Sequence, residues 1–545
     1  MGFPSAVVRS LVATTLATCL SPHGVAEEGN GIAADEILIE YPIVQPADLA
    51  LGNGFGKAVA LEGSTLVASS TGEGLPLILG IPPISIFSGG QGSVYIFERR
   101  GSEWLETAKL SKFAGDFGHS LAISGNTLLV GAPNDGISTV LDEGFQIVFI
   151  PDPNGGDPFF ISATPPGPGA VYVFVRDGSN WHEQAILRPS EGDDGDRFGH
   201  SVAIEGDTIV VGAFGEDADS ALGETDNSAT DSGAAYVYTR AGESWTRQAY
   251  LKVSNVNSAA NFGASVAIST KTILIGAPGN TELEVSVGGN GNPFPGAAYL
   301  FSCEGVDNDR WVETAKLTPL KGAPNDQFGL SVGLSGDTAV IGARHTDSAS
   351  IYTRDTGTNT WSREARFSGE ENSLFGEVVA IEGDTIVVGA RRKGEEGAAE
   401  LFSREDGNWS GGKLLEAADG AQDSGFAESL ALSGRSVIVG AYARPFGPEQ
   451  FAAGGIHVFA PAAAETAGQI SSISRRALFT EVSMPIPFGR LVGVAYSTDL
   501  APESWIELGN FFERDGKLVF QDPDLVRLAR SRGYYRAFLR PTAAE

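Results

Sequence analysis

One short segment of the chain has the spacing of a hydrolase nucleophile. Gly329-Leu330-Ser331-Val332-Gly333 fits the pattern G-x-S-x-G, which places a catalytic serine on a tight turn between a strand and a helix. Here the segment falls inside an alternating, strand-like run, and matching runs elsewhere in the chain read "GHSVA" and "GASVA". We therefore interpret the match as accidental.

Two histidines are the next candidates for chemistry. His119 and His200 each follow a Phe-Gly pair, and two imidazoles at matching positions can share a metal ion. The residues at the other matching positions are of mixed type: Lys57, Ala264, Leu330, Glu377 and Glu428. A mixed set favours a variable edge position over a metal centre.

An acidic segment, residues 215–233, could bind Ca²⁺. Calcium takes six to eight oxygen ligands, so several carboxylates must converge. The predicted ligands are Asp217, Asp219, Asp226 and Asp231. The alternative is a solvated acidic loop without a metal.

The elements that carry these residues form a repeat. A Phe-Gly motif recurs along the chain, with spacings from 47 residues (Phe328 to Phe375) to 81 residues (Phe117 to Phe198). Its seven copies begin at Phe55, Phe117, Phe198, Phe262, Phe328, Phe375 and, weakened to Phe-Ala, Phe426. A constant motif with variable spacers is typical of one structural unit with variable loops.

Each unit predicts four antiparallel strands. In the third unit these are "FGHSVAI", "TIVVGA", "GAAYVYTR" and a strand beginning near Trp245. A Gly206-Asp207 turn joins the first two. Seven such units predict an all-β fold, a seven-bladed β-propeller of four-stranded blades.

The ends of the chain indicate how the ring closes. The seventh unit lacks a fourth strand, whereas "LIEYPIVQP" (38–46) is similar to the fourth strand "WHEQAILRP" (181–189). We expect a strand at about 37–46 to complete blade seven, which would remove two open sheet edges. The predicted propeller spans residues 37–461.

These units resemble FG-GAP repeats, the blades of integrin alpha-subunit propellers and of many secreted bacterial proteins. The resemblance rests on the Phe-Gly pairs and on strings such as Val130-Gly131-Ala132-Pro133. Integrin-type calcium sites use an Asp-rich loop between the first two strands. Here that connection is a two-residue turn such as Gly206-Asp207, too short to wrap an ion. The integrin calcium site is therefore not carried over, and the acidic loop of blade three is the predicted place for Ca²⁺.

Two segments flank the predicted propeller. Residues 1–26 have a basic start and a short apolar core, which predicts a secretory signal peptide cleaved after Ala26. Residues 470–545 contain short strand patterns that predict a small C-terminal β-sandwich module. The expected location is therefore extracellular or at the cell surface.

Charge and cysteine content restrict the possible partners. The net charge of −31 argues against nucleic-acid binding, because phosphate backbones would be repelled. After cleavage only Cys303 remains, so no internal disulfide is expected. No later segment is long and apolar enough to span a membrane. The protein is expected to be a monomer.

Long apolar loops are the best candidates for a binding surface. They interrupt blades one and two between strands two and three, and loops of this length are usually functional or disordered. The candidate residues are Leu77, Ile78, Ile86, Phe87, Phe145, Phe149, Phe159 and Phe160. They form either a self-packed cap or an apolar binding patch. Because blades five and six have short loops, a site is expected nearer blades one to four.

Two functions are compatible with this sequence. The first is a secreted, non-catalytic binding or adhesion protein that uses its loops to hold a protein or glycan surface. The alternative is a lectin or carbohydrate-active enzyme with a pocket in the propeller. Tryptophans that precede the fourth strands, such as Trp245, could stack on sugars or simply pack. Neither activity follows from a propeller fold alone.

Overall fold

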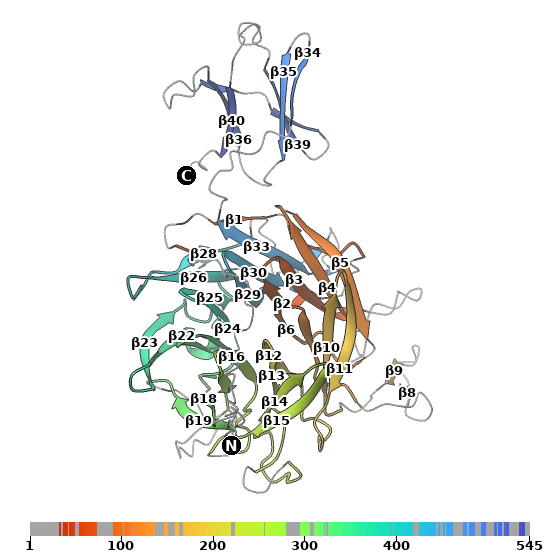
Figure 1. The fold of residues 1–545 in the computed structure, drawn as a ribbon, viewed down its shortest axis with the longest axis vertical. Coiled ribbons are helices and arrows are strands. Elements are labelled where there is room, and N and C mark those ends of the chain that lie inside the picture. The colour runs from red at the N-terminus through yellow and green to blue at the C-terminus, as the bar shows by residue number, and fades with distance from the viewer. Residues whose placement is uncertain are drawn as a thin grey trace, which may run out of the picture.

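The computed structural model describes a ring of seven antiparallel sheets (Figure 1). It describes residues 32–461 with gaps, the longest being 74–90, 137–146, 151–158 and 280–294. Beyond residue 461 it describes only the backbone of seven strands between Ser472 and Leu539.

Each of the first four blades is a four-stranded antiparallel sheet. Blade one has β2 (Phe55–Glu62), β3 (Thr65–Glu73), β4 (Gln91–Arg100) and β5 (Glu103–Lys112). Blade two has β6 (Ser120–Ser124), β7 (Thr127–Ala132), β10 (Ala170–Asp177) and β11 (Asn180–Leu187). Blade three has β12 (Ser201–Glu205), β13 (Thr208–Ala213), β14 (Ala234–Ala241) and β15 (Ser244–Leu251). Blade four has β16 (Ser265–Ser269), β17 (Thr272–Ala277), β18 (Ala297–Glu304) and β19 (Arg310–Leu317).

The later blades repeat this plan with small departures. Blade five has β20 (Val332–Ser335), β21 (Thr338–Ala343), β22 (Ser348–Asp355) and β23 (Thr360–Ser368), with a 3₁₀ turn η1 (Arg344–Thr346). Blade six has β24 (Phe375–Glu382), β25 (Thr385–Ala390) and β26 (Ala398–Glu405), and its outer strand is split into β27 (Asn408–Trp409) and β28 (Lys413–Leu415). Blade seven has β29 (Phe426–Ser433), β30 (Ser436–Ala441) and β33 (Gly455–Pro461).

The N-terminal strand β1 (Leu38–Glu40) supplies the fourth strand of blade seven. It pairs antiparallel with β33, and Val44 adds a bridge to Ile456. The first strands of the blades contact one another around the ring, and β2 meets β29 to close it. Figure 1 shows the red β1 beside the blue β33 at this junction.

The core lies between neighbouring blades rather than inside any one of them. The second strands are buried along almost their whole length, as in β13, "TIVVGA". Because blades cover both faces of each sheet, these strands are apolar in succession instead of alternating. The phenyl rings of the Phe-Gly pairs are the largest shared core residues, and each of the seven is at most 1% exposed.

Smaller pieces complete the description. In the long connection of blade two, β8 (Ile147–Ile150) and β9 (Phe159–Ser162) pair as a hairpin. In blade seven, β31 (Pro445–Phe446) pairs with β32 (Phe451–Ala452). The C-terminal strands form two sheets: β34 (Ser472–Arg476), β35 (Phe479–Pro485), β38 (Phe511–Arg514) and β39 (Lys517–Asp522); β36 (Val492–Ser497), β37 (Ile506–Leu508) and β40 (Tyr534–Leu539). No helix within the described ranges is long and apolar enough to cross a membrane.

Candidate binding face

Strand register places the variable connections on one face of the ring. In blade three, Ser201 pairs with Gly212 and Ala213 pairs with Ala234, so the start of β12, the end of β13 and the start of β14 lie together. Ala235 pairs with Leu251 at the end of β15. The connections between strands two and three, and those between blades, therefore emerge on this face, the loop face. The tight turns within blades emerge on the opposite face, the hairpin face.

The loop-face ends of the first strands form an inner rim. We define the inner rim by two sets of residues. The first set is the residue that follows each Phe-Gly or Phe-Ala pair. The second set is the residue that follows the final alanine of the second strand in blades three, five, six and seven. The first set is Lys57, His119, His200, Ala264, Leu330, Glu377 and Glu428; the second includes Phe214, Arg344, Arg391 and Tyr442. Residues far apart in sequence thus meet at one end of the ring.

Ion pairs run along half of this rim, from blade five to blade one. Arg344 Nη1 lies 3.0 Å from Glu377 Oε1, and its Nε donates to Gln327 Oε1 at 2.5 Å. Arg391 bridges the next two acids, with Nε 3.0 Å from Glu377 Oε2 and Nη1 2.8 Å from Glu428 Oε2. Lys57 of blade one then pairs with Glu428 of blade seven.

This half of the rim has an excess of positive charge, whereas the whole chain is strongly acidic. Three cations, Lys57, Arg344 and Arg391, share two carboxylates, those of Glu377 and Glu428. The chain as a whole carries a net charge of −31. The cation side chains are 27–33% exposed, so they can contact a ligand while their partners hold them in place.

The other half of the rim is formed by imidazole and phenyl rings. His119 and His200 lie with ring centroids 4.7 Å apart, and Phe214 packs edge-on against His200 at 4.5 Å. The Arg197 guanidinium lies over the Phe214 ring at 5.6 Å. The contact between these tilted rings explains why two histidines stand at matching positions of blades two and three.

Both imidazoles are neutral at physiological pH. Burial, reinforced by the positive charge of Lys57, lowers the pKa of His119 to about 4. Burial, reinforced by His119, lowers the pKa of His200 to about 3. The Nδ1 atom of His200 is buried, and no described group forms a hydrogen bond with it.

The predicted calcium ligands lie in the blade-three loop and fall into two pairs. Asp217 Oδ1 accepts a hydrogen bond from the Asp231 backbone N at 2.7 Å, and Asp226 Oδ2 accepts one from the Asp219 backbone N at 3.0 Å. Each pair therefore ties one part of the loop to another. Among the described residues, no three His, Cys, Asp or Glu side chains are grouped as a metal site. Calcium binding stays a prediction.

A buried ion pair anchors the base of the same loop. Lys252 and Glu216 are in contact, and their side chains are only 5% and 4% exposed. Tyr250 donates its hydroxyl to Glu216 Oε1 at 2.7 Å, and Lys252 also donates to the Gly233 carbonyl at 2.9 Å. Burial lowers the pKa of Lys252, against the opposing effect of Glu216.

Near this loop, the carboxyl group of Asp196 has a strongly shifted pKa. Burial, followed by the repulsion of neighbours that include Glu216, raises its pKa to about 7, although the Asp193 backbone N donates to it. A raised pKa is a common property of catalytic acids, but ion-pair networks produce it too. Asp196 is 5% exposed, and its hydrogen bond closes the turn before Phe198.

The predicted apolar loop residues fall largely outside the described residues. Leu77, Ile78, Ile86, Phe87 and Phe145 are not described. Phe149, Phe159 and Phe160 are described in backbone only, and Phe149 pairs with Phe160 in the β8–β9 hairpin. The choice between a self-packed cap and a binding patch stays open.

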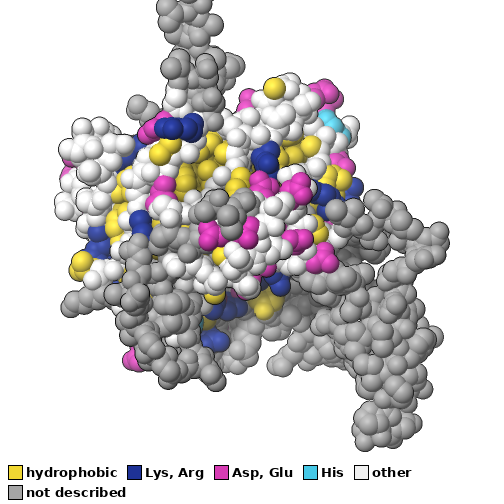
Figure 2. Space-filling view, turned by 90° about the horizontal axis from the view of Figure 1, so that it is seen from below, with side chains coloured by type: hydrophobic (Ala, Val, Ile, Leu, Met, Phe, Trp, Pro, Cys, Tyr) yellow, Lys and Arg dark blue, Asp and Glu magenta, His cyan; other side chains and the backbone are white. Residues whose placement is uncertain are grey.

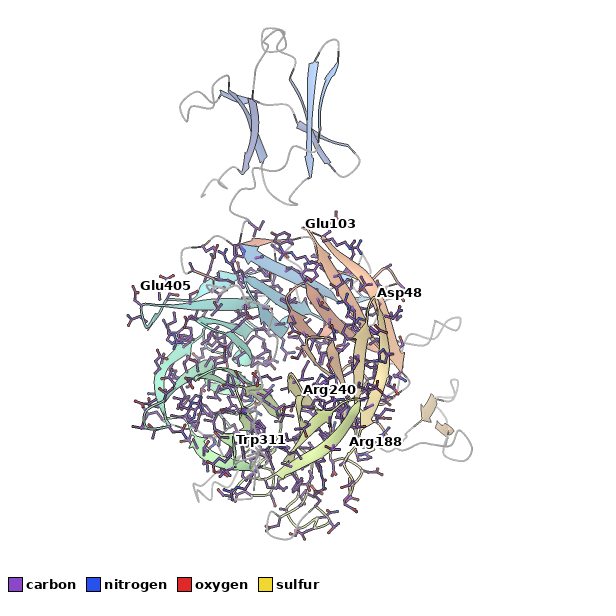
Figure 3. All side chains as sticks on the ribbon, viewed as in Figure 1. Asp48, Glu103, Arg188, Arg240, Trp311 and Glu405 are labelled. Carbon is purple, nitrogen blue, oxygen red and sulfur yellow. The ribbon has the colours of Figure 1, made fainter. Side chains whose placement is uncertain are left out.

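The repeated tryptophans pack between blades. Trp245 belongs to the core cluster between blades two and three, and its Nε1 donates to Gln184 of blade two at 2.8 Å. Arg240 lies over the Trp245 ring at 5.0 Å, next to the tight turn of the hairpin face. Figure 3 labels Arg240 and also Trp311, which makes the matching bond to Gln248 at 3.0 Å. These rings are half-buried packing residues at the outer strands.

The side of the ring shown in Figure 2 has no single dominant surface character. Hydrophobic, basic and acidic side chains are interspersed there among other residues. The charges of the inner rim form a continuous chain of contacts.

Sequence comparison identifies the repeats. Residues 181–238, 245–301, 311–357 and 361–402 match the family model described as FG-GAP repeat. Each matched segment begins at the outer strand of one blade and ends in or near the third strand of the next. No curated protein matches the chain.

Two solved structures align with the chain at low identity and low TM-score. A "putative 6-phosphogluconolactonase" from Bacteroides uniformis is 12% identical with a TM-score of 0.43, over 69% of this chain and 88% of that one. A protein from Lactobacillus plantarum is 9% identical with a TM-score of 0.38, over 72% and 88% of the two chains. The closed ring of sheets shows that the chain forms a seven-bladed β-propeller, and the four matched segments show that it contains FG-GAP repeats between residues 181 and 402.

Proposed function

We propose that this protein is a non-catalytic binding protein that holds a protein or glycan ligand on its loop face. The observation that carries the proposal is the inner rim. Its cations are held in fixed positions by shared carboxylates, and they remain partly exposed beside a neutral aromatic half. A preorganised arrangement of this kind lowers the entropic cost of binding.

The rim favours a ligand that carries negative charge as well as apolar surface. Arginine side chains held by carboxylates offer their remaining donors to an anion. The rings of His119, His200 and Phe214 offer aromatic surface for an apolar or sugar-like group. An acidic glycan or an acidic protein segment has both properties.

The proposed location is outside the cell. The support is the signal-peptide pattern of residues 1–26. Mass determination of the mature N-terminus after expression in a secreting host tests it, and a chain beginning at Glu27 is the expected result. A mature protein that retains Met1 to Ala26 would contradict it.

Arrays of glycans and of extracellular proteins test the binding role. We expect the purified full chain to bind a restricted set of acidic ligands, and a variant lacking residues 137–166 of the blade-two loop to bind them more weakly. The arrays are run with Ca²⁺ and with a chelator, which also tests the predicted calcium site. Absence of ligands on both arrays, or turnover of a bound glycan, would contradict the proposal.

A further inference from the structure

Blade five departs from its neighbours at one buried position of the third strand. In blades one to four this position is a tyrosine that is at most 6% exposed: Tyr95, Tyr172, Tyr236 and Tyr299. In blade five it is Ser350. Blades six and seven carry other large side chains, Glu400 and His457, which pair with Lys393 and Glu40 respectively. Serine is the smallest residue in the series.

A cavity lies where the tyrosine ring stands in the other blades. Its volume is about 270 Å³, and Ser350 and the phenyl ring of Phe328 line it. Leu320, from the link that follows blade four, and Ser348 contribute further walls. An apolar cavity of about 150 Å³ is enough to hold benzene. The loop lengths favour a site nearer blades one to four, whereas this cavity belongs to blade five.

The cavity has the geometry of a slot for an aromatic ring. In blades one to four, the phenyl ring of the Phe-Gly pair packs edge-on against the tyrosine, with centroids 5.1–5.8 Å apart. Phe328 lacks this partner, and among the described aromatic rings it contacts Tyr352, at 6.4 Å. A flat ring in the cavity would restore the contact made by the tyrosines, in the edge-to-face geometry that aromatic pairs prefer.

An arginine from the neighbouring strand lines the slot. Arg366 is the residue directly opposite Ser350 in the β22–β23 pair. In two other blades the residue opposite the tyrosine is a lysine that lies over its ring: Lys109 at 4.9 Å from the Tyr95 centroid, and Lys316 at 5.5 Å from that of Tyr299. Arg366 keeps this position in blade five, with no ring of the described residues beneath it.

A second arginine gives the opening a positive charge. Arg363 faces Tyr352 on the same side of the sheet and also lines the cavity. No ion pair or hydrogen bond joins its guanidinium to any described residue, and Arg366 makes one long bond, to the Thr346 carbonyl at 3.5 Å. Asp326 is the acidic residue in the lining, so the lining has a net positive charge. Two guanidiniums at one opening suit a carboxylate.

We propose that the blade-five cavity binds a small aromatic carboxylate, with its ring in the vacant tyrosine slot and its carboxylate on Arg363 and Arg366. The Ser350 hydroxyl, which makes no hydrogen bond within the described part of the chain, is available to a polar group on the ring. This site does not depend on the proposed role of the inner rim, since its arginines lie on the outer strand β23.

Titration calorimetry of the full chain with 4-hydroxyphenylacetate tests the proposal. This probe joins a tyrosine-like ring to a carboxylate. We expect saturable binding at one site, and binding of 4-methylphenol and of acetate that is each at least about tenfold weaker, a loss of about 1.4 kcal/mol. Acetate binding as tightly as the full probe would overturn the aromatic slot.

Three variants locate the binding. Ser350→Tyr fills the slot as in blades one to four, so we expect it to abolish binding while the thermal unfolding midpoint is at least that of the parent. Arg366→Gln should weaken binding about tenfold. Arg310→Gln, an exposed arginine of blade four, is the matched control and should change it less than about twofold. Unchanged binding in folded Ser350→Tyr, or no saturable binding by the parent protein, would overturn the proposal.

Discussion

At the scale of single residues, the Phe-Gly pair is a packing device. Phe262 is fully buried, and Gly263 adopts φ +89° directly against the start of β14 in the preceding blade. A Cβ atom at Gly263 would lie 2.3 Å from the Ala234 carbonyl oxygen. Blade seven has an alanine in place of this glycine, and that alanine, Ala427, adopts a smaller positive φ of 66°. The motif is therefore fixed by backbone geometry and needs no chemical role.

Alanine at Gly263 should be far more costly than alanine at an open turn. We expect Gly263→Ala to lower the free energy of unfolding by about 2–4 kcal/mol, through positive-φ strain and overpacking. Gly206→Ala is the control, because Gly206 has φ +57° and a Cβ atom added there would meet nothing within 4 Å; it should cost about 1 kcal/mol. Urea unfolding measures both, and equal losses would contradict this explanation of the motif.

The paired histidines should make the fold sensitive to acid. Their folded pKa values, about 4 for His119 and about 3 for His200, lie below the value of 6.5 for a free imidazole. The unfolded chain therefore binds more protons below pH 6.5, and stability present above that pH is lost as the pH falls toward 4. Asp196, with its raised pKa, acts in the opposite sense and contributes stability that is lost as the pH rises through about 7.

A variant isolates the histidine contribution. Relative to His119→Asn/His200→Asn, the parent protein should lose up to about 1.4 kcal/mol per pH unit for each histidine between pH 6 and pH 5. Urea unfolding at several pH values gives the two slopes. Parallel slopes for the two proteins would show that these imidazoles titrate normally.

At the scale of elements, the strands follow from the sequence and the side-chain networks do not. The alternation of "FGHSVAI" and the Gly206-Asp207 turn predict β12 and β13, which pair in the expected hairpin. The same pattern recurs in the seven units, which strengthens the prediction of strands. The repeat pattern does not predict the split outer strand of blade six, and Gly411-Gly412 lies at its break. It does not predict the β8–β9 hairpin either, because the segment between β7 and β10 carries no repeat motif.

The inner rim illustrates why the site is harder to predict. Lys57 and Glu428 are 371 positions apart, and only the closed ring brings them together. Their matching places after the Phe-Gly or Phe-Ala pair can be read from the sequence, but a mixed set of residue types suggests mere variability. The substitution of Ser350 for tyrosine can also be read from the aligned third strands. Its consequence, a cavity, depends on three-dimensional packing.

The buried pair at the base of the blade-three loop allows a test at this scale. Lys252→Met leaves Glu216 charged and buried, which should cost about 3–5 kcal/mol of unfolding free energy. Lys252→Met/Glu216→Gln removes that charge and keeps an acceptor for Tyr250, so it should recover most of the loss. Lys109→Met is the matched control, because its pair with Asp48 is exposed; it should cost less than about 1 kcal/mol. A double variant as unstable as Lys252→Met would contradict this assignment.

At the scale of the whole molecule, the two faces of the ring differ in how regularly their residues repeat from blade to blade. The hairpin face repeats one arrangement in several blades, in which Arg240, Arg354 and Arg404 pair with turn aspartates. The loop face does not repeat, because its rim residues and loops differ from blade to blade. A contact that repeats in several blades indicates a structural role. A position whose residue differs from blade to blade is a candidate for ligand recognition.

Face-resolved affinity is the most direct test of the binding role. The array ligand that binds most tightly is titrated against two folded double variants, Lys57→Ala/Arg344→Ala on the inner rim and Arg240→Ala/Arg354→Ala on the hairpin face. We predict that the rim variant loses at least about tenfold in affinity and that the hairpin-face variant stays within about twofold of the parent. A loss confined to the hairpin-face variant, or equal affinity in all three proteins, would contradict binding at the inner rim.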